Sequence, residues 1–361
     1  MSQTTEQVVL DALKQIIDPD LRKDIVTLGF IRDLAISGGA VSFRIVLTTP
    51  ACPVKEEMET AAREIVSGLP GVSSVNITMD AEVPKGRGIA NNIAVPGVKN
   101  IIAVSSGKGG VGKSTVAVNL AVSLALDGAK VGLMDADVYG PNVPLMLGVA
   151  DAQPQVANNQ LLPIKAHGIK MISMAVLAPP DKPMILRGPM LHGIVRQFLS
   201  DVNWGELDYL IVDMPPGTGD VQLSLAQLVP VQGAVLVTTP QNVSIADVLR
   251  ALKMFEQVNV PVLGVVENMS YFVPPDMPDK RYNIFGEGGG RNLADEHGVP
   301  FLGEVPLGME VREAGDKGTP VVISNPESPQ SKAFRAVAEE VARYISIEAM
   351  KPELVILSKK Q

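Results

Sequence analysis

Residues 107–114 carry the pattern Gly-x-x-x-x-Gly-Lys-Ser, whose residue types and spacing suit the binding of nucleotide phosphates. The glycines let backbone N–H groups face phosphate oxygens, and the dipole of a following helix adds to this positive field. Lys113 can neutralise the β- and γ-phosphates, and Ser114 can ligate Mg²⁺. The expected nucleotide contacts in this loop are Gly107, Lys108, Gly109, Gly110, Val111, Gly112, Lys113, Ser114 and Thr115.

Acidic residues follow two other apolar runs. Asp213 ends "YLIVD", where a carboxylate would hold Mg²⁺ through water, and Asp135 and Asp137 follow "KVGLM". Carboxyl ends of parallel strands meet at one crevice, so these groups are expected near the loop. An ordinary helix cap is the alternative for Asp135 and Asp137. The chain has no Asn-Lys-x-Asp motif for reading guanine, which favours ATP over GTP.

The elements that position these residues alternate between buried strands and helices. Apolar, β-branched runs at 100–106, 130–137, 208–216, 233–240 and 260–269 predict strands, and 113–128 and 244–258 predict two of the helices between them. Such alternation produces right-handed βαβ units. The sequence therefore predicts an α/β P-loop NTPase fold, with a mostly parallel sheet covered by helices on both faces.

The first 80 residues predict a different order of helices and strands. A helix capped by Thr4 or Thr5, two β-rich runs around residues 37–39, a helix at 54–69 and a strand at 72–79 predict a small α-β-β-α-β unit. We therefore expect an α+β domain at 1–82, a Gly-, Pro- and Asn-rich linker at 83–99, the ATPase domain at 100–347 and a tail at 348–361.

The composition limits the compartment and the partners. The 361-residue chain has a net charge of −8, which disfavours nucleic acid and anionic membranes as partners. Its single cysteine excludes an intrachain disulfide and fits a reducing compartment. We recognise no signal peptide and no run long enough to span a membrane, so a cytoplasmic location is expected.

Besides Lys113, the loop has another lysine, Lys108, and this pair of lysines resembles a known motif. "GKGGVGKST" is similar to the deviant Walker A motif of the MinD, ParA and nitrogenase iron protein class. That resemblance implies a homodimer in which Lys108 reaches the phosphates bound by the partner chain, acting as a cationic finger. It also implies that Asp137 positions the attacking water, so Lys108, Lys113 and Asp137 would be the catalytic residues. A solvated loop lysine is the alternative for Lys108.

Longer segments narrow the resemblance to the Mrp/ApbC family of iron–sulfur cluster carriers. The matching pieces are "MDADVYGPNVPLMLG", "ILRGPM", "DYLIVDMPPGTGD", "TTPQ", "ENMSYF" and "FGEGGG". The first 80 residues resemble the SufT/PaaD group through "DPD", "DIVTLGFI" and "TTPACP". By this resemblance Asn268 would contact the adenine, although a helix or loop cap is its alternative.

One family feature is missing. Many Mrp/ApbC proteins carry Cys-x-x-Cys after the segment matching "ENMSYF", whereas this chain has "VPPDMPDKRYNIFG" there. Two chains therefore cannot supply four cysteine thiolates to a bridging iron–sulfur cluster at that position. Cys52 is the remaining candidate ligand of an iron–sulfur cluster. It precedes Pro53 at an expected helix start, which would lower its pKa; a half-buried structural cysteine is the alternative.

The expected function is that of a dimeric, slow ATPase that assists iron–sulfur cluster assembly or delivery, with apo client proteins and cluster-assembly proteins as partners. ATP and Mg²⁺ are the expected cofactors, with a cluster as a possible third. Two alternatives remain open, namely a spatial-organiser ATPase similar to MinD or ParA, and an ATP-dependent adaptor that binds no cluster. The tail "ISIEAMKPELVILSKKQ" is interrupted by Pro352, unlike a membrane-binding amphipathic helix.

Overall fold

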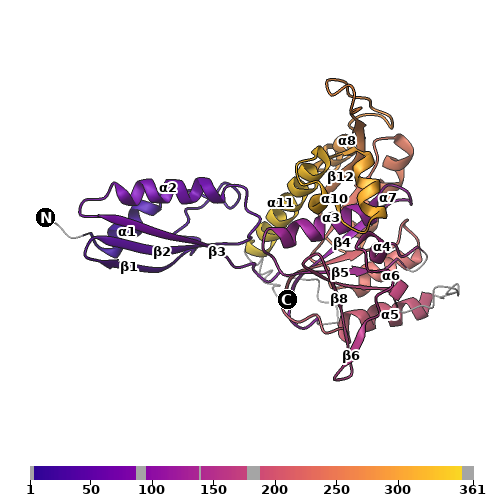
Figure 1. Ribbon diagram of the computed structural model, residues 1–361, viewed down its shortest axis with the longest axis horizontal. Coiled ribbons are helices and arrows are strands. Elements are labelled where there is room, and N and C mark those ends of the chain that lie inside the picture. Colours follow the sequence, from indigo (N-terminus) through magenta and orange to yellow (C-terminus); the bar gives the residue numbers. More distant parts are fainter. Residues whose placement is uncertain (1–3, 87–94, 138–139, 177–187, 352–361) are drawn as a thin grey trace, which may run out of the picture. The chain divides into compact units, whose positions relative to one another are not determined.

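The computed structural model describes residues 4–86, 95–137, 140–176 and 188–351 (Figure 1). The chain forms two compact units: a small unit of residues 1–86 and 343–361, and a large unit of residues 87–342. Residues 87–94 of the expected linker and 352–361 of the expected tail lie outside the described residues. Each unit is described by itself below.

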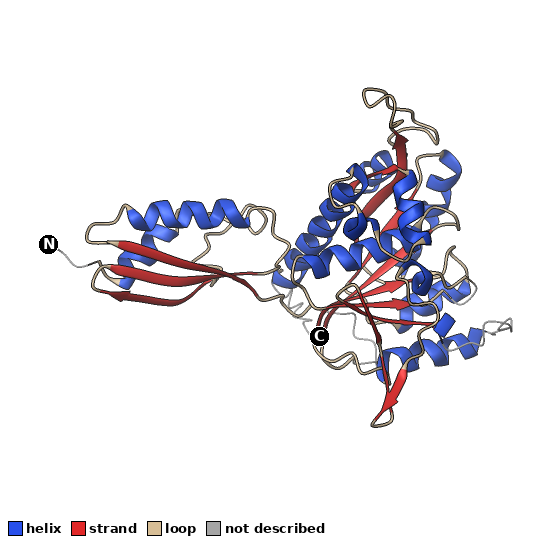
Figure 2. Cartoon of the chain, viewed as in Figure 1, coloured by secondary structure: helices blue, strands red, loops and turns tan. Residues whose placement is uncertain are grey.

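The small unit has the predicted α-β-β-α-β order. Its central strand pairs antiparallel with the first strand and parallel with the third. Helix α1 begins where expected, because the Thr5 side chain accepts a hydrogen bond from the Val8 N–H. Figure 2 shows both helices on one face of the sheet. The elements are α1 (Glu6–Leu13), β1 (Ile31–Ser37), β2 (Ala40–Leu47), α2 (Lys55–Ser67) and β3 (Ser74–Ala81).

The large unit is built on an eight-stranded sheet in the order β13-β12-β11-β4-β10-β5-β9-β8. Neighbouring strands are parallel except β8 and β9, which are antiparallel. The predicted fold class is therefore confirmed. The strands are β4 (Val98–Ser106), β5 (Val131–Asp135), β8 (Ile164–Ala166), β9 (Ile169–Ser173), β10 (Leu207–Asp213), β11 (Gly233–Thr238), β12 (Val262–Phe272) and β13 (Phe301–Leu307), with a separate hairpin of β6 (Gln155–Ala157) and β7 (Gln160–Leu162).

Helices pack on both faces of this sheet (Figures 1 and 2). One layer runs through α5, α6, α7 and α8, which pack in sequence against one another, and α3 packs with α4 and α10 in the other. The helices are α3 (Lys113–Leu126), α4 (Val143–Met146), α5 (Gly188–Ser200), α6 (Asp220–Leu228), α7 (Asn242–Gln257), α8 (Gly289–His297), α9 (Met309–Asp316), α10 (Val321–Ser324) and α11 (Pro329–Met350), and the 3₁₀ turn η1 spans Met174–Val176.

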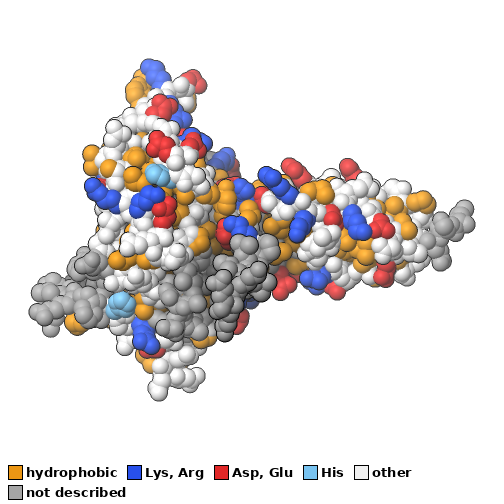
Figure 3. All heavy atoms as spheres, turned by 180° about the vertical axis from the view of Figure 1, so that it is seen from behind, with side chains coloured by type: hydrophobic (Ala, Val, Ile, Leu, Met, Phe, Trp, Pro, Cys, Tyr) orange, Lys and Arg blue, Asp and Glu red, His pale blue; other side chains and the backbone are white. Residues whose placement is uncertain are grey.

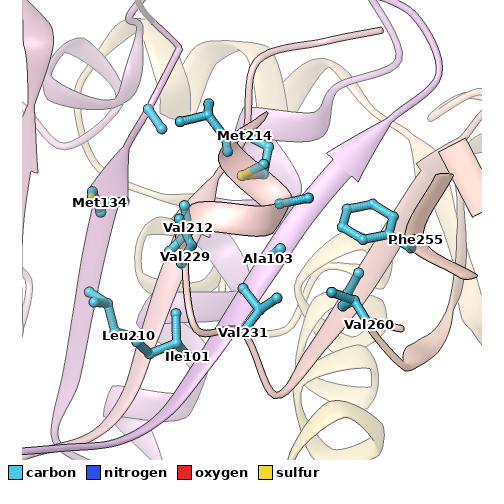
Figure 4. Close-up of a cluster of buried hydrophobic side chains, with 14 of the residues drawn as sticks. Ile101, Ala103, Met134, Leu210, Val212, Met214, Val229, Val231, Phe255 and Val260 are labelled. Atoms are coloured by element: carbon cyan, nitrogen blue, oxygen red, sulfur yellow. The ribbon is translucent and has the colours of Figure 1, made fainter. Parts of the chain in front are cut away.

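The core explains why the strands are continuous apolar runs. Every residue of β5 is buried, because helices cover the sheet on both sides. In Figure 4, Leu210 and Val212 of β10 lie in a cluster with Ile101 of β4, Met134 of β5 and Phe255 of α7. This packing holds the carboxyl ends of β4, β5 and β10 next to one another.

The described surface carries charges of both signs. On the face shown in Figure 3, Lys and Arg side chains are interspersed with Asp and Glu. No helix within the described residues combines the length and apolar character needed to cross a membrane.

Candidate functional site

The glycine-rich loop joins the end of β4 to the start of α3. Gly112 is the N-cap of α3 with φ 81°, and Gly110 has φ 82°, so both adopt left-handed backbone that favours glycine. A Cβ on Gly107 would lie 2.1 Å from the backbone carbonyl carbon of Asp247 in α7. Backbone conformation and close packing therefore explain these three glycines, and the loop presents the N-terminus of α3 to the crevice.

Lys113 and Asp213 form a buried ion pair beside this N-terminus. The ammonium donates to Asp213 Oδ1 and, over 3.2 Å, to the hydroxyl of Ser114. The second oxygen, Asp213 Oδ2, is buried without a hydrogen-bond partner among the described residues. Burial raises the pKa of Asp213, against the effects of Lys113 and Ser114. A carboxylate oxygen without a partner beside a hydroxyl is a donor set that fits Mg²⁺.

Asp135 lies beside this ion pair on the adjacent strand. It is the register partner of Asp213 across the β5–β10 pairing. Its Oδ2 accepts a hydrogen bond of 2.9 Å from Ser173 Oγ, at the end of β9, and its Oδ1 accepts one of 3.1 Å from Asp137 N. Burial, and then the charge of Asp213, raise the pKa of Asp135 to about 8. The structure thus places a third polar strand end, Ser173, next to the two carboxyl groups.

Asp137 occupies the turn that follows β5. It is buried, and its Oδ1 accepts a hydrogen bond of 3.3 Å from Gly140 N. Neither Asp135 nor Asp137 caps a helix, because Asn142 is the N-cap of α4. The charge of Asp137 is also one of the causes that raise the pKa of Asp213. Asp137 therefore lies at the predicted crevice, while its action on water stays a prediction.

Asn268 is fixed against the glycine-rich loop. Its Nδ2 donates to Val111 O over 2.8 Å, and a Cβ on Gly112 would come within 2.2 Å of that nitrogen. No described residue donates to its Oδ1. Asn268 and Thr115 also line a cavity of about 270 Å³, whose other wall is formed by residues 306–308, 311–312 and 315–316. The asparagine thus holds the loop and borders a cavity, and its contact with adenine stays a prediction.

Lys108 lies in the same loop with its side chain half-buried. Its carbonyl oxygen accepts a hydrogen bond of 3.0 Å from Ser106 Oγ, and Ser106 O accepts one of 3.0 Å from Gly217 N. These bonds join the glycine-rich loop to the loop after β10. No ion pair within the described part of the chain engages the Lys108 ammonium, whose role in a dimer stays a prediction.

Cys52 lies in the small unit, between β2 and α2. The expectation that a helix N-terminus lowers its pKa is wrong. Helix α2 begins at Lys55, with Val54 as N-cap, so Pro53 is not its first residue. Burial raises the pKa of the thiol, and the nearby charges of Asp18 and Asp20 add to this shift.

Cys52 lines a cavity together with charged side chains. Asp18 and Asp20 line this cavity, as does Arg343, which pairs with Asp20 Oδ1 over 3.1 Å. Asp18 is only 7% exposed, and its Oδ1 accepts hydrogen bonds from the backbone of Asp20 and Leu21. The single thiol is therefore partly buried and lies in a cavity that two carboxyl groups also line.

Parts of two expected motifs are not described by the structure, and some residues of the site were not predicted. Residues 138–139 and 185–187, which belong to two of the quoted motifs, lie outside the described residues. Sequence reasoning missed Ser173 and the cavity wall at 306–316, for which no sequence pattern gave a signal. Across the described ranges, no group of three or more His, Cys, Asp and Glu side chains is arranged to hold a metal ion.

A mostly parallel sheet, a glycine-rich loop before α3 and a buried ion pair between the first lysine of α3 and the last aspartate of β10 define a P-loop NTPase. Residues 97–342 match the family described as NUBPL iron-transfer P-loop NTPase, and residues 6–79 match the family described as iron-sulfur cluster assembly protein. The chain belongs to the family of NUBPL iron-transfer P-loop NTPases, with an iron–sulfur cluster assembly domain at its N-terminal end. The predicted resemblance is thereby confirmed.

Similarity to curated relatives and to solved structures agrees with this family. The chain is 57% identical to an iron-sulfur cluster carrier protein of Synechocystis, over 96% of this chain and 99% of that protein. It is 46% identical to the chloroplastic Fe-S cluster assembly factor HCF101 of Arabidopsis thaliana, over 93% of this chain and 63% of that protein. A nucleotide-binding protein of Archaeoglobus fulgidus in complex with ADP is 39% identical, with a TM-score of 0.58, and the match covers 65% of this chain and 92% of that chain.

Proposed function

We propose that this protein is an ATP-driven carrier that helps to assemble iron–sulfur clusters or to deliver them to client proteins in the cytoplasm. The observation that carries the proposal is the similarity to a cluster carrier of Synechocystis, which extends over 96% of this chain and therefore over both units. The buried Lys–Asp pair at the glycine-rich loop supports the nucleotide-dependent part.

ATP would bind with its phosphates at the N-terminus of α3 and its base in the cavity beside Asn268. Because the Nδ2 of Asn268 is bonded to Val111 O, its Oδ1 is left to accept a hydrogen bond from the amino group of adenine. Ser114 and the second oxygen of Asp213 would hold Mg²⁺, which would neutralise phosphate charge. Asp137 would orient the attacking water.

Hydrolysis would require a homodimer. Lys113 of each chain is buried against Asp213, whereas the Lys108 side chain is half-buried and lies outside that pair. Lys108 would therefore extend to the nucleotide of the partner chain and stabilise the charge of the transferring phosphoryl group. Turnover would be slow, because a nucleotide-dependent switch needs long-lived states that clients can recognise.

The cluster would be cargo with few ligands from this chain. Cys52 is the only thiol, so two chains supply two thiolates where a typical cluster takes four. Client or assembly proteins would supply the remaining thiolates. Because burial and neighbouring carboxyl groups raise the pKa of Cys52, iron would have to displace a proton from this thiol.

Anaerobic reconstitution with iron and sulfide tests this proposal. Wild type and Cys52→Ser would be compared by iron and sulfide content and by visible absorption, alone and with an added apo client. We expect a labile cluster in wild type that is lost in the variant. If both proteins take up equal, stable amounts of cluster, the assignment of Cys52 fails. If neither transfers any cluster in the presence of ATP, the carrier function itself fails.

A further inference from the structure

A third cavity opens at the β8 edge of the large unit's sheet. Its volume is about 540 Å³, and it is lined by residues 152–155, by 162–165, and by Lys170 and Asn203. Lys170 lies at the start of β9 and Asn203 precedes β10, whereas Ser173 and Asp213 end the same two strands. Because these strands are parallel, the cavity lies at their amino ends, away from the glycine-rich loop.

The shape of this cavity comes from the hairpin beside it. Gln155 of β6 pairs with Leu162 of β7, and the chain segments that run on from this pair, 152–154 and 163–165, both line the cavity. Strand β8 forms one of the sheet's two edges and pairs with β9. Figure 1 shows β6 and β8 at the same end of the large unit. The last residue pair of the hairpin and the edge strand β8 therefore both border the cavity.

Two lysines lie side by side in the lining of this cavity. Lys165 of β8 and Lys170 of β9 are register partners in an antiparallel pair, so their side chains project from the same face. Like charges directly opposite are destabilising in a sheet. Within the described ranges neither lysine forms an ion pair, and no carboxylate lines the cavity. Two positive charges therefore stand together, and no carboxylate of the described residues forms an ion pair with either.

The surroundings concentrate this positive charge. The Lys170 ammonium donates to the carbonyl oxygen of Trp204, which fixes its position. Burial lowers the pKa of Lys170, and the charges of Lys165 and Lys130 lower it further, while Glu206 acts in the opposite sense. An anion in the cavity would relieve the repulsion among these lysines.

The remaining lining suits a small molecule. Gln153, Gln155 and Asn203 offer amide donors and acceptors, while Leu162 and Ile164 offer apolar surface. A volume of about 540 Å³ lies within the range of roughly 300–1,000 Å³ that is usual for small-molecule sites. A mostly apolar wall with a few fixed polar groups is typical of such sites.

We propose that this cavity binds a small organic or inorganic polyanion, bearing two or more carboxylate or phosphate groups, through Lys165 and Lys170. The site is separate from the nucleotide loop, so the inference does not depend on the proposed carrier function. The multiple charges of the ligand match the two ammonium groups, and the amide side chains fix its orientation.

Calorimetric titration of the full chain tests this proposal with two probes, citrate for carboxylates and pyrophosphate for phosphates. Titrations run in magnesium-free buffer at constant ionic strength, in wild type and in a Lys113→Met background that weakens phosphate binding at the glycine-rich loop. We expect one site per chain that survives in the Lys113→Met background. Lys165→Gln and Lys170→Gln should each weaken binding about tenfold, because each removes a charge-assisted hydrogen bond.

The exposed Lys280 supplies the matched control, since Lys280→Gln removes one positive charge elsewhere. Equal affinity in Lys165→Gln and Lys280→Gln would overturn the proposal, as would the absence of binding by both probes at millimolar concentration. Binding of a polyglutamate peptide without binding of either small anion would also overturn it, and would identify a docking surface for acidic peptides instead. Binding of one probe alone would support the site and identify its anion class.

Discussion

Asp135 and Asp213 are register partners on the adjacent parallel strands β5 and β10, and both side chains are fully buried. Lys113 pairs with Asp213, so one ammonium group faces two carboxyl groups. Removing two negative charges from water for one positive charge is costly, which favours the protonated form of one carboxyl group. This explains why the pKa of Asp135 is raised to about 8.

The first prediction concerns the pH dependence of stability. The pKa of Asp135 is raised from 3.8 to about 8, so the stability contributed by its protonated form is present below about pH 4 and is lost as pH rises through about 8. In Asp135→Asn this loss should disappear, and the melting temperature should fall less between pH 6 and 9 than in wild type. Trp204, the only tryptophan, reports on the large unit by fluorescence.

The exposed Asp276 provides a control for this measurement, because Asp276→Asn removes one carboxyl group at the surface. Its melting temperature should follow the wild-type pH dependence. Identical pH profiles for Asp135→Asn and wild type would show that Asp135 is ionised in the folded protein.

A second prediction separates binding from hydrolysis at the two lysines. Lys113→Ala should abolish tight ATP binding, because it removes the charge at the N-terminus of α3. Lys108→Ala should leave ATP affinity within about threefold of wild type and lower the hydrolysis rate by roughly 10³-fold, the usual effect of losing a cationic finger. Equilibrium binding of a fluorescent ATP analogue and phosphate release would be measured on each variant.

Mixing the two variants tests whether Lys108 acts across a dimer interface. Chains with Lys108→Ala keep an intact binding site, and chains with Lys113→Ala keep an intact Lys108. A mixture should therefore recover part of the hydrolysis if the lysine acts on the partner's nucleotide. No recovery over either variant alone would show that Lys108 acts within its own chain.

The sequence was most informative where burial and backbone geometry leave few choices. Strands such as β5 are covered on both faces, so their apolar runs were visible in the sequence. Gly112 and Lys113 could be assigned because the phosphate-binding pattern is local to one loop, and Gly112 has the left-handed backbone that favours glycine. The three-residue strands β6, β7 and β8 were not predicted, because so few residues carry no measurable periodicity.

Contacts between distant residues could not be read from the sequence. The hydrogen bond between Ser173 and Asp135 joins residues 38 positions apart, and no spacing rule connects them. The local pattern at Cys52 predicted a lowered pKa, but burial raises it, and the charges of Asp18 and Asp20 add to that effect. Local sequence therefore located the candidate residues, while the tertiary packing determined their protonation and partners.

A third prediction addresses the choice of base. Because the Nδ2 of Asn268 is bonded to Val111 O, its Oδ1 is the atom available to the base. This oxygen is an acceptor, which suits the amino group of adenine better than the carbonyl oxygen of guanine. Asn268→Ala should reduce the preference for ATP over GTP by about tenfold, the value of one hydrogen bond to a buried group. Competition binding of both nucleotides measures this ratio. Asn292→Ala, at an exposed position of α8, should leave it unchanged.

The last prediction uses the single thiol. Because the pKa of Cys52 is raised, its alkylation by iodoacetamide should be slow at neutral pH and should accelerate only at clearly alkaline pH. Asp18→Asn removes a neighbouring negative charge but keeps an oxygen that can accept the hydrogen bonds from Asp20 and Leu21. This variant should shift the pH profile of alkylation to lower pH and raise the rate at pH 8 several-fold.

Asp33→Asn serves as the control, because Asp33 is an exposed carboxylate on β1 that pairs with Arg44 and does not line the cavity. Its alkylation profile should match that of wild type. Mass spectrometry of the peptide that contains Cys52 gives the rate directly, since the chain has a single thiol. If Asp18→Asn and Asp33→Asn gave the same profile, burial alone would control the thiol, and the carboxyl groups around Cys52 would have no part in releasing its proton to an incoming metal.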